Sequence, residues 1–78
     1  MISFAQICKI EPYFLTLESQ CKNHRPQSGK SVNDFWYHEI KPQVKQLVGF
    51  LANNSDLRSK EAYEVAYQHL YDCLPDHA

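Results

Sequence analysis

Gly29, Lys30 and Ser31 are the three residues that close a phosphate-binding P-loop, which makes them the most suggestive short motif in the chain. The complete motif also needs a glycine five residues before Gly29, and that position is His24. A P-loop holds phosphate with consecutive backbone N–H groups, and Pro26 removes one of these donors. The sequence therefore predicts no nucleotide site, and we interpret residues 23–33 as a loop between helices.

A second set of residues has the spacing of metal ligands. His69, Cys73 and His77 follow one another at steps of four, so one continuous helix would place them on one face. Imidazole and thiolate are both zinc ligands. However, Pro75 interrupts such a helix between Cys73 and His77, and no second compact pair of ligands occurs in the sequence. We therefore predict no metal and no cofactor, with Cys73 packed as a small apolar side chain.

Nucleophilic catalysis would require a reactive thiol or hydroxyl in a cleft. The cysteines, Cys8, Cys21 and Cys73, all lie on or beside apolar helical faces, where a thiol is unreactive. Their odd number and irregular spacing fit a reducing compartment. Only two glycines are present, and little of the chain remains from which a pocket could be built. The protein is therefore expected not to be an enzyme, and no catalytic residue is predicted.

A locally basic segment lies directly before three consecutive aromatic residues. The basic residues are Lys22, His24, Arg25 and Lys30, and the aromatic ones are Phe35, Trp36 and Tyr37. Such a combination can hold single-stranded nucleic acid by phosphate contacts and base stacking. The whole chain carries eight Lys and Arg against nine Asp and Glu, so its net charge of −1 gives no general attraction to nucleic acid or anionic membranes. A small nucleic-acid-binding regulator that uses the Lys22–Lys30 segment is therefore the alternative function.

The elements that carry these residues are predicted to be helices. Ser3 and Gln6 form a capping box at the start of a helix over about residues 3–22, and Pro12 interrupts it. A second helix over about 34–52 contains Pro42, and a third over about 59–74 is stopped by Pro75. Apolar residues recur at steps of three and four in each helix. These are Ile7, Ile10, Phe14, Leu17 and Cys21; Tyr37, Ile40, Val44, Leu47 and Leu51; and Tyr63, Ala66, Leu70 and Cys73 or Leu74.

This pattern predicts a single all-α domain over residues 1–78, with loops at 23–33 and 53–58. The domain is a small three-helix bundle with proline-kinked helices, or a four-helix bundle if the chain divides at Pro12 or Pro42. No stretch shows the alternation of a half-buried strand. The beginning of the chain does not resemble a signal peptide, and no apolar stretch is long enough to span a membrane. We therefore expect a cytoplasmic protein without membrane contact.

The apolar residues exceed what one small core can bury. Phe35, Trp36 and Tyr37 are consecutive, so they cannot share one helical face, and further apolar residues widen the second and third helices. Excess apolar surface indicates a partner. We therefore predict a non-enzymatic interaction or regulatory module that docks this surface on another protein through Phe35, Trp36, Tyr37, Val48, Phe50, Tyr67 and Tyr71. We also expect a compact homodimer in which Val44, Leu47 and Leu51 divide their contacts between two chains.

Overall fold

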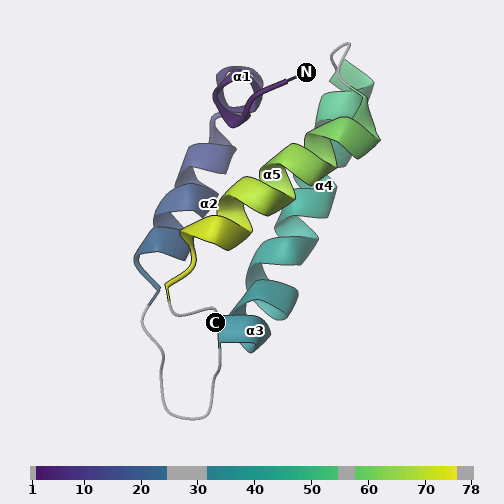
Figure 1. The fold of residues 1–78 in the computed structure, drawn as a ribbon. Coiled ribbons are helices and arrows are strands. Elements are labelled where there is room, and N and C mark those ends of the chain that lie inside the picture. Colours follow the sequence, from purple (N-terminus) through teal and green to yellow (C-terminus); the bar gives the residue numbers. More distant parts are fainter. Residues whose placement is uncertain (1, 25–31, 55–57, 76–78) are drawn as a thin grey trace.

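The computed structural model describes residues 2–24, 32–54 and 58–75, and every regular element in these ranges is helical (Figure 1). Helix α1 spans Phe4–Ile10 and α2 spans Tyr13–Lys22. Helix α3 spans Val32–Phe35 and continues through a π-helical turn at Trp36–Ile40 into α4, which spans Lys41–Asn54. Helix α5 spans Ser59–Cys73. Because the segment from α3 to α4 is continuous, the described residues form four helices. The predicted all-α fold is confirmed, in its four-helix form.

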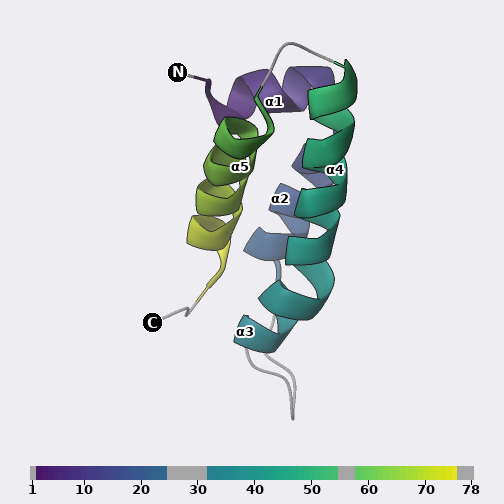
Figure 2. The same ribbon diagram turned by 90° about the vertical axis from the view of Figure 1, so that its right-hand side faces the viewer.

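The chain divides at Pro12, and α1 turns away from α2 there. Ser3 caps α1 through the predicted capping box. Its hydroxyl oxygen accepts a hydrogen bond from the backbone N–H of Gln6 at 3.2 Å, and its own backbone N–H donates to Gln6 Oε1 at 2.7 Å. Glu11 ends α1 in an extended conformation, as the residue before a proline favours. Figure 2 shows α1 lying across one end of the longer helices. Ile10 is consequently 42% exposed and does not continue the buried face that was predicted for one long helix.

Pro42 does not divide the second helix. It lacks the N–H that would bond to the carbonyl of His38, and its ring would clash with that carbonyl in a regular α-helix. The preceding residues instead form the π-helical turn, in which the N–H of Lys41 donates to the carbonyl of Trp36, five residues back. The Gln43 side-chain amide donates to the carbonyl of Glu39. The helix therefore continues past Pro42, and the local change that this proline requires is the π-helical turn.

The π-helical turn decides which residues of this helix are buried. An α-helix has 3.6 residues per turn, so side chains at strict steps of four drift around its axis. The wider π turn reduces this drift. The buried face accordingly follows steps of four and then one of three: Val32, Trp36, Ile40, Val44, Val48 and Leu51. Tyr37, predicted on the buried face, is 53% exposed instead.

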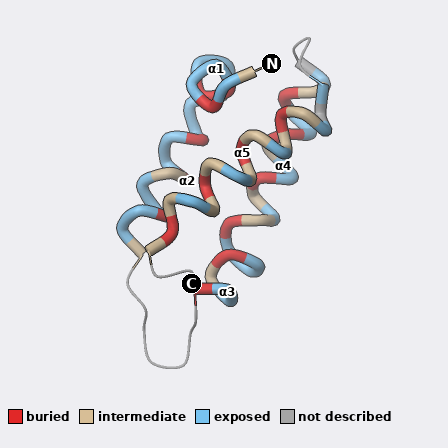
Figure 3. The backbone as a smooth tube through the Cα atoms, viewed as in Figure 1, coloured by how far each residue is buried: buried red, intermediate tan, exposed pale blue. Residues whose placement is uncertain are grey.

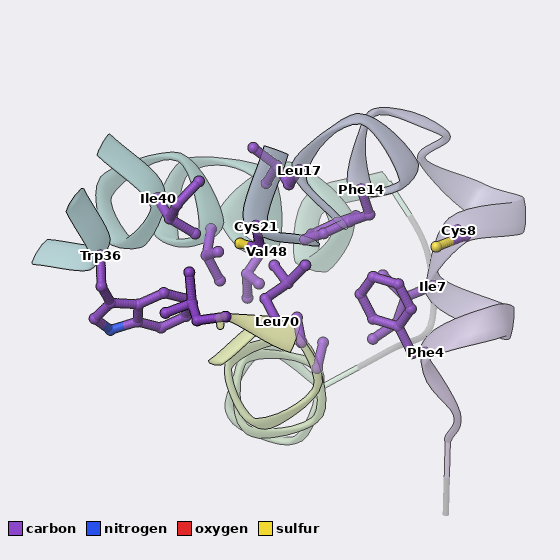
Figure 4. Packing of buried hydrophobic residues seen from close by; sticks show 14 of the residues in the cluster. Phe4, Ile7, Cys8, Phe14, Leu17, Cys21, Trp36, Ile40, Val48 and Leu70 are labelled. Carbon is purple, nitrogen blue, oxygen red and sulfur yellow. The ribbon is translucent and has the colours of Figure 1, made fainter. Parts of the chain in front are cut away.

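Helix α5 packs against α1, α2 and α4, and it buries Ala62, Ala66, Leu70 and Leu74. Figure 3 shows buried positions recurring along each helix between exposed ones. The core extends from Trp36 at one end to Phe4 and Ile7 at the other (Figure 4). Leu74 is extended before Pro75, so α5 ends where the sequence predicted. In the part of the chain that the structure describes, no helix combines the length and apolarity needed to cross a membrane.

Candidate functional site

The most unusual side-chain arrangement lies where α2 and α5 pack side by side. Glu18 on α2 is half-buried because its neighbours Leu17 and Cys21 belong to the core. His69 on α5 is half-buried for the same reason, next to Leu70. The two side chains meet, and His69 Nε2 donates to Glu18 Oε2 at 2.5 Å. An imidazole and a carboxylate from two separate helices are thus held in direct contact.

The imidazole of His69 is also held from a third helix. The Phe4 ring on α1 stacks on it with a centroid distance of 3.9 Å and an interplanar angle of 10°. Phe4 in turn packs edge-on against Phe14, at 6.1 Å and 80°. Stacking on one face and a hydrogen bond at Nε2 together fix the orientation of the His69 ring. The site is therefore preorganised by α1, α2 and α5.

The thiols of the described chain gather around the carboxylate of Glu18. Burial first, and then the charge of Glu18, raises the pKa of Cys8 above its ordinary value. Burial raises the pKa of Cys21 to about 12, with further contributions from Cys73 and Glu18. The pKa of Cys73 is raised by burial and by Glu18 and Asp72, against a lowering by Lys22. All three thiols are therefore protonated near neutral pH, which is the unreactive state that the sequence predicted.

Cys73 lies close enough to the other two residues to form a cluster with them. The Sγ of Cys73, a carboxylate oxygen of Glu18 and a ring nitrogen of His69 all lie within 4.8 Å of one another. Each of the three residues is half-buried. Thiolate, imidazole and carboxylate are the ligand types of zinc. We refer to Glu18, His69 and Cys73 below as the Glu-His-Cys cluster.

An open apolar groove of about 440 Å³ lies beside this cluster, between α1 and α2. Leu15 lines it and is 51% exposed, although the adjacent Phe14 is fully buried. Lys9, Glu18 and His69 supply the polar part of the lining. We call this the α1–α2 groove, and its complete lining is Phe4, Ala5, Cys8, Lys9, Leu15, Glu18 and His69.

The aromatic residues predicted to bind a partner are not all accessible. Trp36 is fully buried, with its ring edge-on to Tyr67 at 4.9 Å and to Tyr71 at 5.2 Å. Val48 is also buried, at 4% exposure. The expectation that these two side chains lie on the surface is therefore wrong. Trp36 and Val48 lie on the face that is buried at every fourth residue from Val32. The π-helical turn brings them onto this face because it changes the helical register.

The remaining predicted residues do not form one continuous surface. Phe35 is half-buried and stacks on His24 at 4.0 Å, while Tyr67 and Tyr71 are half-buried against Trp36. Tyr37 and Phe50 are exposed, at 53% and 50%. They lie thirteen positions apart on one continuous helix, a separation of about 20 Å. A partner that contacts one of these two rings therefore need not contact the other.

The predicted homodimer interface is also only partly accessible. Val44 and Leu51 are fully buried inside a single chain, so they do not divide their contacts between two chains. Leu47 is half-buried and packs against the same core. The expectation for Val44 and Leu51 is wrong, because α5 packs against α4 and these two side chains belong to the core of one chain. The homodimer itself stays a prediction.

The structure describes only the first residues of the basic segment Lys22–Lys30. Lys22 is exposed, and its Nζ lies 3.9 Å from the Glu18 carboxylate. His24 is half-buried against Phe35. Arg25 and Lys30 lie outside the described residues, as do the Gly29-Lys30-Ser31 motif and His77. Nucleic-acid binding by this segment stays a prediction.

Sequence reasoning missed the α1–α2 groove and the role of Glu18. One signal for the groove was available: Leu15 is a large apolar residue that lies outside the buried face predicted for the first helix. No local pattern pointed to Glu18, because its contact with His69 joins residues 51 positions apart. The chain matches no family model, no curated protein and no solved structure. Its function must therefore be inferred from its own residues.

Proposed function

We propose that this protein is a non-enzymatic interaction module that binds an amphipathic helix of another protein in the α1–α2 groove. The half-exposed Leu15 is the observation that carries this proposal. A large aliphatic side chain is left uncovered beside the apolar surfaces of Phe4, Ala5 and Cys8. Covering such a surface removes apolar area from water, which is the main favourable contribution to protein association.

The walls of the groove are held in place before any partner arrives. Phe4 is fixed between His69 and Phe14, and the capping box fixes the first turn of α1. A groove that is already formed loses little conformational entropy on binding. This supports a docking site rather than a surface that must fold around its partner.

Lys9 defines the charge of the expected partner. It lies in the last turn of α1, it lines the groove, and no carboxylate of the described residues forms an ion pair with it. A partner helix that places an apolar side chain against Leu15 can place an Asp or Glu one turn away, next to Lys9. We therefore infer an acidic amphipathic helix as the occupant, bound by the helix-in-groove mode.

A library of helical peptides displayed on phage tests this proposal with the protein alone. We expect the enriched peptides to combine apolar residues at helical spacing with acidic residues. Leu15→Glu should weaken their binding at least about tenfold, because it places a charge on the apolar wall. Gln20→Glu is the matched control, since it adds the same charge to an exposed position of α2 that does not line the groove. Equal binding to both variants, or no enrichment, would contradict the proposal.

A further inference from the structure

We propose that the Glu-His-Cys cluster is a zinc site that joins α2 to α5. Glu18 supplies a carboxylate oxygen, His69 supplies Nε2 and Cys73 supplies Sγ. The mixture of nitrogen, sulfur and oxygen ligands favours zinc over magnesium or calcium, which take oxygen ligands. This inference does not depend on the proposed partner helix.

The geometry of the cluster fits a tetrahedral ion after small movements. Zinc–ligand bonds of about 2.0–2.3 Å place neighbouring tetrahedral ligands about 3.3–3.7 Å apart. The three ligand atoms lie within 4.8 Å of one another, and the closest pair is His69 Nε2 and Glu18 Oε2 at 2.5 Å. An ion that enters between these two atoms separates them by about 1 Å and draws Cys73 Sγ inward.

Each ligand atom must be free of its proton when it binds the ion. Zinc binds thiolate, so Cys73 releases its proton to water when the ion enters. His69 must then carry its remaining ring proton on Nδ1, which leaves Nε2 free to bind. Glu18 already accepts a hydrogen bond at the oxygen that would bind the ion. With thiolate and carboxylate as ligands, the charge of the bound ion is fully neutralised.

The surroundings of the cluster favour a cation. Without an ion, the carboxylate of Glu18 would repel a thiolate at Cys73, and the exposed Lys22, whose Nζ lies 3.9 Å from Glu18 Oε2, must move aside when an ion enters. A divalent cation removes that repulsion because it attracts both the carboxylate and the thiolate. Glu18 and His69 also line the open α1–α2 groove, so the ion has a path from solvent and room for one water as a fourth ligand.

Cobalt(II) replaces zinc in such sites and reports its ligands by absorption. We expect purified protein to bind Co²⁺ with a thiolate-to-cobalt charge-transfer band that zinc abolishes by displacement. The band should be absent in Cys73→Ser and present in Cys8→Ala, which removes a thiol outside the cluster. His69→Gln should weaken binding of zinc at least about tenfold, since even outer ligand partners contribute that much. No band, or a band that survives in Cys73→Ser, would overturn the proposal.

Alkylation of the wild-type protein provides a second test that needs no variant. Mass spectrometry after iodoacetamide treatment measures the reaction of each cysteine separately. Zinc should slow the alkylation of Cys73 at least about tenfold and should not slow that of Cys8, because only Cys73 becomes a ligand. Equal rates for Cys73 with and without zinc would overturn the proposal even if Cys73→Ser failed to fold. Both tests use the protein without a partner, so their failure would leave the α1–α2 groove proposal standing.

Discussion

His69 and Glu18 are in direct contact at 2.5 Å, although 51 positions separate them in the sequence. The same imidazole stacks on Phe4, so one side chain connects α5 to both α2 and α1. Helix α1 has only seven residues, and an isolated helix of this length is not stable in water. These contacts therefore hold α1 in place, and with it one wall of the α1–α2 groove.

Phe4→Ala should loosen α1 more than the rest of the bundle. The substitution removes both the stacking on His69 and the edge-on contact with Phe14. We expect backbone amides of residues 4–10 to exchange at least about tenfold faster, with a much smaller change in α4 and α5. Hydrogen exchange followed by mass spectrometry measures this, with Phe50→Ala as the exposed aromatic control. An equal change in all helices would show that α1 is not held by these contacts.

Trp36→Ala should destabilise the monomer strongly. The ring is fully buried and packs edge-on against Tyr67 and Tyr71. Truncation of a buried aromatic residue of this size costs about 3–5 kcal/mol of unfolding free energy, which is much of the stability of a small domain. Tyr37→Ala, next to it but 53% exposed, should cost about 1 kcal/mol or less. Urea denaturation compares the two, and similar losses would contradict the buried position of Trp36.

The buried thiol of Cys21 should make the protein less stable in alkaline solution. Its pKa is about 12 in the folded chain, against about 8.5 in the unfolded chain. Between these values the unfolded state has lost the proton and the folded state keeps it, so the free energy of unfolding falls as pH rises. Urea denaturation at pH 8 and pH 10 should show a decrease of about 2 kcal/mol from this thiol. Cys21→Val should show a smaller total decrease, because only Cys8 and Cys73 keep raised pKa values in that variant. The same decrease in both proteins would exclude Cys21 as its source.

Self-association should depend on the exposed side of α4. Val44 and Leu51 are buried within one chain, which leaves Phe50 as a large exposed apolar residue of this helix. We expect sedimentation equilibrium over a hundredfold range of concentration to show a homodimer, and Phe50→Glu to shift it to monomer. Lys45→Glu, at another exposed position of α4, is the control. A monomer at every concentration would exclude the homodimer.

The sequence predicted the helical class, the Ser3 capping box, an interruption at Pro12 and the end of α5 at Pro75. These features depend on residues close together in the chain, so local rules suffice. The buried face of the second helix was predicted incorrectly because those rules assume a regular α-helix. The π-helical turn before Pro42 moves Tyr37 out of the core and Trp36 into it.

The candidate site was much less predictable from the sequence. His69, Cys73 and His77 stood out by their spacing, but the sequence predicted no metal site because Pro75 interrupts the helix before His77. The structure brings Glu18 from α2 instead, a long-range contact that depends on how α2 and α5 pack. The α1–α2 groove likewise exists only because α1 turns at Pro12 and leaves Leu15 uncovered.

Photo-crosslinking from position 15 tests the central claim, that the α1–α2 groove binds another protein, most directly. A photoreactive amino acid replaces Leu15 in one version of the protein and Gln20 in a control version, both expressed in the cells that make the chain. Position 15 lines the groove, whereas position 20 is exposed on α2 outside it. We predict that irradiation yields a covalent adduct with a distinct protein from position 15 only, and that the crosslinked segment is an acidic amphipathic helix. No adduct from position 15, or the same adducts from both positions, would contradict the account.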